Sequence, residues 1–357
     1  MRPTFLPILA VLALAAPAAA QPPETTRLAD LHNIASVDMP TLANLRTAPE
    51  SRGRAYQGRN NGPEQTERFS RKVRVGRDGR VTVSNIAGDI IVNAGSGDEV
   101  SIEAVKRARG DSGQLSSVRI DVQERAGSVY IQTTHTGRND HVSVDYTITM
   151  PASAAADVHS VSGNVKVTGI RGSMRAESVS GNVTATDTPK LEAAKSVSGD
   201  VTLSGVTTEG DLSAGSVSGS VIARNVKVHS LEIGSVSGDL TATDVACDRL
   251  MAKSVSGSVE YSGAITKAGN YDINVHSGDV RLKLANPAGF VLNATSFSGS
   301  IRSDLPLTIG GDSSARDRDR GGRRSGMDNH SMRATYGDGS ATLIVRTFSG
   351  DIVISKR

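Results

Sequence analysis

One tetrapeptide, Ser-Val-Ser-Gly, returns at a nearly constant interval and restricts the folds open to this chain of 357 residues. Its strict copies are Ser160–Gly163, Ser178–Gly181, Ser196–Gly199, Ser216–Gly219, Ser235–Gly238 and Ser254–Gly257. Looser copies stand at Val275–Gly278, Ser296–Gly299 and Thr347–Gly350. From Gly163 to Gly299 the glycines are spaced by 18, 18, 20, 19, 19, 21 and 21 residues. A period near twenty predicts a solenoid, in which each repeat is one small unit stacked on the last.

Side chains around each glycine predict the cross-section of one coil. The second residue after the glycine is aliphatic in every repeat and is expected to point inward: Val165, Val183, Val201, Val221, Leu240, Val259, Val280 and Ile301. The sixth residue is one that tolerates a positive φ, which predicts a corner: Gly169, Asp187, Gly205, Asn225, Asp244 and Gly263. Alternation counted backwards from the glycine places both serines of the phrase inward and the valine between them outward.

Buried serine hydroxyls need hydrogen-bond partners, which the stacked coils can supply along the ladder or at backbone carbonyls. The opposite parity, with the valines inward and the serines outward, stays open because a corner can reverse the alternation.

The fold class expected is all-β: a β-solenoid of about 18–21-residue coils with an irregular β cap at the N-terminal side. Aromatic residues make up only 3% of the chain, tryptophan is absent and there are 37 glycines, a composition that suits thin layers of small aliphatic side chains. The organisation expected along the chain is a signal peptide at 1–20, a flexible leader or linker at 21–70, a β-rich cap at 71–157, regular repeats at 158–310, an Arg/Asp/Gly-rich disordered insertion at 311–334 and a closing β coil at 335–357.

The beginning of the chain has the pattern of a secretory signal. Arg2 precedes the apolar run Phe5–Ala16, and Ala18-Ala19-Ala20 forms an A-x-A cleavage site. The run is short for a membrane span. We therefore expect an exported protein, periplasmic or extracellular after cleavage near Ala20, with no transmembrane segment in the mature chain. The net charge of +3 is small for this length and gives no indication of nucleic-acid binding.

The sequence predicts no catalytic residue, no cofactor and no metal site. Four aspartates directly follow a phrase glycine, but Asn or Ser occupies the same slot in other repeats, which favours a turn role: Asp200, Asp239, Asp279 and Asp351. The histidines lack metal-site spacing, and the Gly-Gly-x-Gly-x-Asp repeats of calcium β-rolls are absent. An ice-binding solenoid is disfavoured because the serines are expected to point inward. The single cysteine, Cys247, cannot form an internal disulfide.

Three features together resemble a known family. They are Asp145–Pro151 leading into the Ser-Gly-Asn-Val coils, the recurrent Ser-Gly-Asp/Asn/Ser-aliphatic phrase, and the closing run from Gly337 to Ile354. Over roughly residues 71–357 they resemble the bacterial putative-adhesin family of β-strand repeats, a domain of unknown function. The resemblance implies a secreted or envelope-associated β-solenoid and says nothing specific about an activity.

Two surfaces are candidates for binding. The outward slot of the phrase predicts a stripe along the solenoid, made by Val161, Val179, Val197, Val217, Val236, Val255, His276 and Phe297. The insertion supplies an electrostatic loop with Arg316, Arg318, Arg320, Arg323 and Arg324. A neighbouring loop or the cap covering the stripe, and a merely solvated loop, are the alternatives to these roles.

The function expected is a non-enzymatic, adhesin-like binding or structural scaffold whose partner is an envelope or surface protein or polysaccharide. The alternative is a solenoid enzyme acting on envelope or extracellular polysaccharide. Such an enzyme is expected to carry aromatic sugar platforms, and the six tyrosines and five phenylalanines lie mostly outside the regular repeats.

Overall fold

The computed structural model describes residues 64–109, 112–136, 142–285, 287–309 and 330–357. All of them belong to one compact unit, Arg59–Arg357. This unit is built from strands, with a single short 3₁₀ helix among the described residues, η1 (Ser112–Ser117). The predicted all-β, solenoid-like fold is therefore confirmed. No helix in these ranges is long and apolar enough to cross a membrane.

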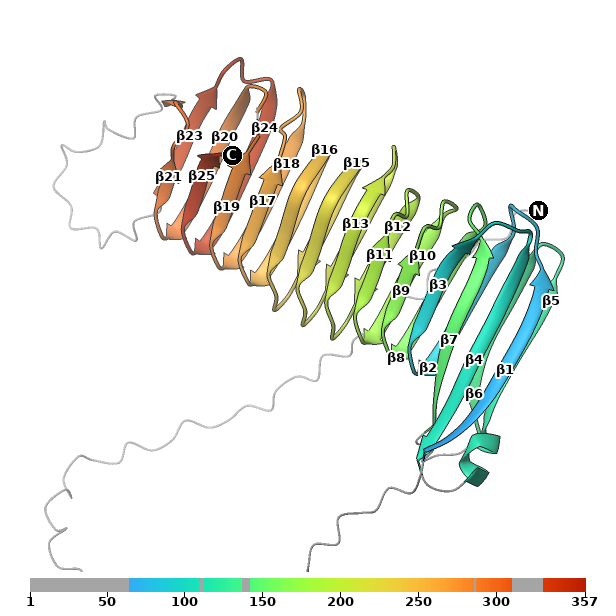
Figure 1. Ribbon diagram of the computed structural model, residues 1–357. Coiled ribbons are helices and arrows are strands. Elements are labelled where there is room, and N and C mark those ends of the chain that lie inside the picture. Colours follow the sequence, from blue (N-terminus) through green and yellow to red (C-terminus); the bar gives the residue numbers. More distant parts are fainter. Residues whose placement is uncertain (1–63, 110–111, 137–141, 286, 310–329) are drawn as a thin grey trace, which may run out of the picture. The chain divides into compact units, whose positions relative to one another are not determined.

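The strands form two ladders, one on each side of the core (Figure 1). In the first ladder, the strands of the regular repeats lead into the Ser-Val-Ser phrases. Its order is β5 (Val118–Arg125), β6 (Ser128–His135), β2 (Arg80–Ala87), β8 (Ala155–Ser162), β10 (Met174–Ser180), β12 (Leu191–Ser196), β14 (Asp211–Ser216), the second halves of β15 (Val221–Ser235) and β16 (Leu240–Ser256), β18 (Asn270–Ser277), β24 (Ala341–Ser349), β20 (Phe290–Ser298), β23 (His330–Tyr336) and β22 (Thr308–Ile309).

In the second ladder, each strand of the regular repeats begins shortly after a phrase glycine. It runs β1 (Glu64–Arg74), β4 (Glu99–Arg109), β7 (Val142–Pro151), β3 (Ile90–Gly95), β9 (Val165–Thr168), β11 (Val183–Thr186), β13 (Val201–Thr207), the first halves of β15 and β16, β17 (Val259–Gly263), β19 (Val280–Leu284), β25 (Ile352–Lys356) and β21 (Ile301–Ser303).

Equivalent residues of successive repeats pair in parallel. Val183 lies between Val165 and Val201 in the second ladder, each 18 residues away in sequence. All the inward-slot aliphatic residues of the regular repeats are buried between the two ladders, apart from the partly exposed Ile301. The hydrophobic core is thus a stack of thin layers, and each layer depends on the next coil for its strand hydrogen bonds.

The phrase glycines form a column that leaves no room for a side chain. A Cβ atom on Gly219 would lie 2.2 Å from the carbonyl oxygen of Gly199, and one on Gly238 would lie 2.2 Å from that of Gly219. The first serine of each phrase uses the same carbonyls, since Ser216 Oγ donates to Gly199 O (2.8 Å) and Ser235 Oγ to Gly219 O (2.9 Å). The repeat therefore needs glycine for close approach and serine to hydrogen-bond the carbonyl that approaches.

The parity of the phrase is half as expected. The valines are exposed, as predicted. The first serines are buried, with 4–7% of their surface exposed: Ser160, Ser178, Ser196, Ser216, Ser235 and Ser254. The prediction that the second serines also point inward is wrong, because Ser162, Ser180, Ser198, Ser218, Ser237 and Ser256 are all exposed. Regular alternation stops where the chain turns toward the glycine. Five of the six predicted corners are confirmed by positive φ angles, among them Asp187 (53°) and Gly205 (69°), whereas Gly263 has no positive φ.

The Asp and Asn side chains that follow the phrase glycines form a row of hydrogen bonds from coil to coil. The Asn164 side chain accepts from the backbone N–H of Asn182 (2.9 Å), and Asn182 accepts from Asp200 N–H (2.8 Å). Asp200 and Asp239 accept in the same way from the next coil at 2.8 Å. The carboxylates in this slot therefore join coils, which supports the turn role inferred from the sequence.

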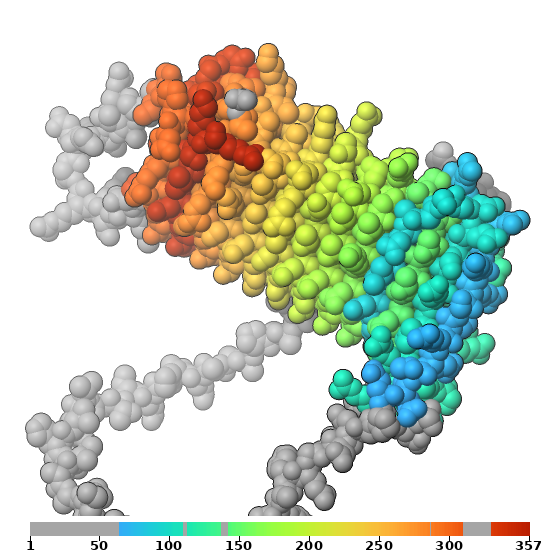
Figure 2. Space-filling model, in the orientation of Figure 1, coloured from blue at the N-terminus to red at the C-terminus, as the bar shows by residue number. Residues whose placement is uncertain are grey.

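The order of coils differs from the order of the sequence at both ends. The last coil, β24 and β25, lies between β18–β19 and β20–β21, so residues 341–356 are inserted one place before the end of the stack. In Figure 2 the red surface of this coil is flanked by orange on both sides. At the other end β2 and β3 pair with β8 and β9, and the antiparallel strands β1, β4 and β5 cover the stack.

Several expected boundaries can be compared with the strands. Strand β1 begins at Glu64, within the predicted linker, and β23 begins at His330, within the predicted insertion. Both strands find antiparallel partners that the sequence pattern does not reveal, β4 and β20. The signal peptide at 1–20, most of the leader and the five loop arginines lie outside the described residues.

Candidate interaction face

The outward valines of the phrase form a continuous apolar row on the surface, which we call the valine stripe: Val161, Val179, Val197, Val217, Val236 and Val255. Each keeps between 44 and 50% of its surface exposed. They stand on neighbouring strands of the first ladder, which are spaced by about 4.8 Å. No described residue covers them fully, so the stripe is an exposed face rather than part of the core.

At its N-terminal end the stripe extends one strand further than the sequence indicated. Ile86, which is also exposed, precedes Val161 in the stack because Asn85 pairs with Ser160. Its phrase, Asn-Ile-Ala-Gly, lacks the serines, so the Ser-Val-Ser-Gly pattern did not identify it as a repeat. Asn85 replaces the first serine and donates from Nδ2 to Gly88 O (2.9 Å) and Val144 O (2.8 Å).

At the other end the valines give way to three stacked rings. His276 stacks on Phe348 with ring centroids 5.0 Å apart, and Phe348 stacks on Phe297 at 4.7 Å. The sequence placed His276 and Phe297 in the stripe but missed Phe348, which the inserted last coil brings between them. Ring faces in this stack contact each other, so mainly ring edges point outward.

Shallow grooves run alongside the stripe. One, of about 500 Å³, is lined by stripe residues from Val161 to Val217 and by residues of the same strands from Ser84 to Ser216. The next, of about 440 Å³, continues from Ser216 to His276. The serines in their walls point inward, with Oγ bonded to glycine carbonyls from Ser178 (3.0 Å) through Ser235 (2.9 Å). The grooves therefore offer aliphatic surface and few free hydrogen-bonding groups.

A charged cluster lies at the N-terminal end of the groove. His159 contacts Asp157 through Nε2 (2.8 Å) and Glu177 through Nδ1 (3.4 Å). The hydrogen bond to Asp157 raises the pKa of His159 and lowers the pKa of Asp157. Beyond it Arg175 pairs with Glu192 at 2.8 Å. The two basic side chains, His159 and Arg175, thus lie against three carboxylates, those of Asp157, Glu177 and Glu192.

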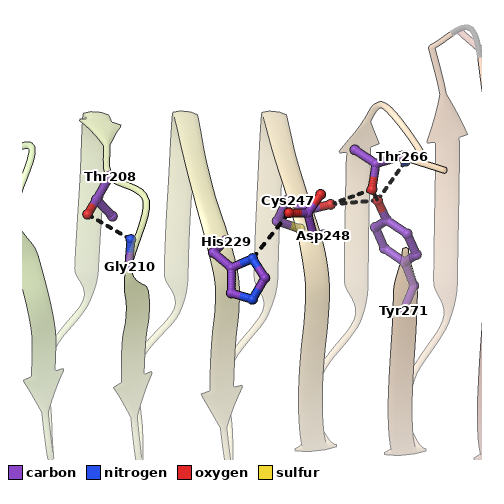
Figure 3. A network of polar contacts seen from close by, with 7 residues as sticks. All are labelled: Thr208, Gly210, His229, Cys247, Asp248, Thr266 and Tyr271. Atoms are coloured by element: carbon purple, nitrogen blue, oxygen red, sulfur yellow. Dashed lines mark hydrogen bonds and ion pairs between the residues drawn. The ribbon is translucent and has the colours of Figure 1, made fainter. Parts of the chain in front are cut away.

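A polar network on the other edge of the coils is the main candidate for chemistry (Figure 3). His229 Nδ1 lies 3.1 Å from Asp248 Oδ2, and the hydroxyl of Tyr271 donates to the carbonyl of Cys247 (2.7 Å). The thiol of Cys247 is buried, which raises its pKa to about 12 and keeps it protonated. An exposed His–Asp pair without an activated nucleophile beside it does not form a catalytic triad.

Metal binding finds no support in the parts of the chain that the structure describes, where no group of three or more His, Cys, Asp or Glu side chains is placed to hold an ion. The aspartates after the phrase glycines are likewise engaged with the backbone of the next coil, as Asp351 is with Ser300 N–H (2.8 Å). Their side-chain oxygens thus join neighbouring coils.

A stack of parallel two-strand coils with antiparallel strands at its ends defines the class of fold. Residues 190–355 match the family model described as Toastrack DUF4097. This part of the chain is therefore similar to that family of unknown function, and the resemblance drawn from the Ser-Gly phrases is confirmed. A comparison with curated proteins found no match.

Several solved structures are similar to this chain. A putative adhesin from Bacteroides fragilis is 13% identical, covers 82% of this chain and 97% of its own, and has a TM-score of 0.41. A putative adhesin from Parabacteroides distasonis is 16% identical over 82% of this chain and 97% of its own, with a TM-score of 0.38. A structure described as a putative lipid binding protein, also from Parabacteroides distasonis, is 10% identical over 81% of this chain and 96% of its own, with a TM-score of 0.38.

Proposed function

We propose that the protein is an exported, non-enzymatic β-solenoid of coils of 18 to 21 residues that binds an envelope or surface component through the valine stripe. The observation that carries this proposal is the half-exposed row of valines on consecutive strands. Long contiguous apolar patches are uncommon on monomeric soluble proteins and mark interaction sites. The proposed location, periplasmic or extracellular, rests on the signal-like pattern of residues 1–20.

The stripe has enough apolar surface to contribute usefully to binding. Fully burying a valine side chain is worth about 1.5–3 kcal/mol, and about half of that remains available at each half-exposed position. Six valines could therefore contribute on the order of 5 kcal/mol before the entropic cost of association. The regular strands beneath them are fixed by both neighbours, so the row is rigid and loses little side-chain or backbone freedom on binding.

The experiment is a pull-down from cell-envelope extract with the chain from Gln21 to Arg357. Three forms are compared: the wild type, Val217→Lys/Val236→Lys, and a deletion of residues 311–329 that stops before β23. Loss of the retained component in the lysine variant alone supports binding through the stripe. Loss only in the deletion assigns binding to the arginine-containing loop instead. Turnover of an envelope glycan by the wild type overturns the non-enzymatic proposal.

A further inference from the structure

The groove wall opposite the valine stripe changes character near its middle. One residue per coil, immediately before the inward-pointing phrase position, forms this wall, which we call the flanking column: His159, Glu177, Lys195, Gly215, Gly234, Lys253 and Asn274. Two lysines thus bracket two glycines on four consecutive strands. With strands about 4.8 Å apart, the lysine positions are separated by about 14 Å along the stack.

The two glycines of the flanking column are not required by the backbone. A Cβ on Gly215 would have its nearest neighbour at 3.4 Å, and one on Gly234 at 3.6 Å, both ordinary contacts. Neither residue has a positive φ. Glycine in a strand interior weakens the strand and often marks a place where a ligand approaches closely. Because these two residues have no side chain, the groove is open beside Val217 and Val236.

The lysines at the two ends of this opening are available to a ligand. Lys195 and Lys253 are exposed, and neither makes an ion pair with another described residue. Glu177, next to Lys195 in the ladder, contacts His159 at 3.4 Å. The nearest carboxylate on the strand of Gly234 is Glu232, on the outward side of β15. Glu177 and Asp272, the carboxylates beside Lys195 and Lys253, contact His159 and Arg346. The two ammonium groups thus face Glu232 as the remaining carboxylate, which favours an anionic ligand.

Other classes of ligand fit the groove less well. A peptide cannot add to these strands, because each strand beneath the groove already pairs on both sides. A polysaccharide needs hydrogen-bond partners, whereas Ser196, Ser216 and Ser235 direct their hydroxyls to glycine carbonyls. An aliphatic chain needs neither a free strand edge nor polar partners.

We propose that the groove between Lys195 and Lys253 binds a single-chain aliphatic carboxylate of the fatty-acid class. Its chain lies over Gly215 and Gly234 against the exposed face of Val217, and its carboxylate pairs with one of the two lysines. This inference rests on the proposed function, since it names the ligand class for the central part of the same face.

The test is calorimetric titration of the chain from Gln21 to Arg357 with dodecanoate, dodecanol and dodecyltrimethylammonium. Dodecanoate is expected to bind about tenfold more tightly than the cation, with dodecanol between them. Gly215→Leu/Gly234→Leu fills the opening and is expected to weaken dodecanoate binding at least about tenfold. The control Thr184→Leu/Thr202→Leu places two leucines on the outward face of the other ladder and is expected to change nothing.

A second pair of variants tests the charge of the two lysines separately from the shape of the groove, and it changes exposed residues only. Lys195→Glu/Lys253→Glu is expected to weaken dodecanoate binding about tenfold and leave dodecanol binding unchanged, whereas Lys166→Glu on the other ladder has no effect. Equal binding of dodecanoate to the wild type and the leucine-filled variant overturns the inference, as does the absence of binding. If the stripe still retains an envelope component while dodecanoate does not bind, the inference fails and the proposed function stands. If neither is bound, both fail.

Discussion

Two glycines four residues apart should respond to alanine in opposite directions. Gly219 belongs to the phrase column, where an added Cβ would lie 2.2 Å from Gly199 O and 2.5 Å from Gly199 C. Gly215 belongs to the flanking column, where the nearest atom, Gly234 O, would be 3.4 Å away. The change is the same single methyl group in the same coil, so the pair isolates the effect of close backbone approach.

The magnitude for Gly219→Ala follows from the contact it must relieve. Restoring 3.4 Å, the lower end of ordinary contact, from 2.2 Å requires the neighbouring backbone to move by 1.2 Å. Overpacking of this kind costs about 1–3 kcal/mol, and weakening a coil-to-coil hydrogen bond adds about 1 kcal/mol. We expect about 3 kcal/mol of destabilisation. Gly215→Ala should stabilise the strand by about 0.5–1 kcal/mol, because alanine loses less conformational freedom than glycine on folding.

The assay is urea unfolding followed by far-ultraviolet circular dichroism, with the slope of the transition compared among the three proteins. A lower midpoint for Gly219→Ala and a slightly higher one for Gly215→Ala, at an unchanged slope, support the glycine column. Equal shifts in the two variants, or an unchanged Gly219→Ala midpoint, refute the close approach of the coils.

Three further predictions concern single side chains. Ser235→Ala should lower the free energy of unfolding by about 1 kcal/mol because it removes a buried hydrogen bond, whereas Ser237→Ala, exposed in the same phrase, should change it by less than about 0.5 kcal/mol in urea unfolding. Asp157 raises the folded-state pKa of His159, so the stability that this pair contributes is present below the unfolded pKa near 6.5 and is lost as the pH rises through the folded-state pKa. The urea midpoint should therefore fall slightly more from pH 6 to pH 8 in the wild type than in His159→Gln. Parallel pH profiles of the two proteins contradict this. Cys247 should react with an alkylating reagent only after denaturation, as followed by mass spectrometry, because burial both shields the thiol and raises its pKa to about 12; rapid labelling of the native protein contradicts this.

The regular repeats could be predicted from sequence because local rules govern them. A fixed glycine spacing, an aliphatic inward slot and corner residues that accept a positive φ each have one structural meaning in a stacked coil. The exposure of the valines followed from strand alternation. The orientation of the second serines did not, because the backbone leaves the regular strand just before the glycine and alternation no longer applies.

The order of the terminal coils and the shape of the groove lay beyond such rules. The copies of the phrase resemble one another, so the local pattern cannot show that β24, residues 341–349, pairs with both β18 and β20. The three-ring stack depends on that insertion. The groove is open because residues 215 and 234 are glycines, Gly215 and Gly234, and because the strand register places them between two lysines.

The most direct test of the binding face is protection of a single residue on it. Val217→Cys and, as a control on the other ladder, Lys166→Cys are prepared in a Cys247→Ala background and labelled with a thiol reagent with and without the envelope fraction that the wild type retains. The account predicts rapid labelling of both cysteines in the free protein and protection by the fraction at position 217 alone. Slow labelling of Val217→Cys in the free protein would mean that another part of the chain covers the stripe, and labelling unaffected by the fraction would mean that the partner binds elsewhere; either result contradicts the central claim.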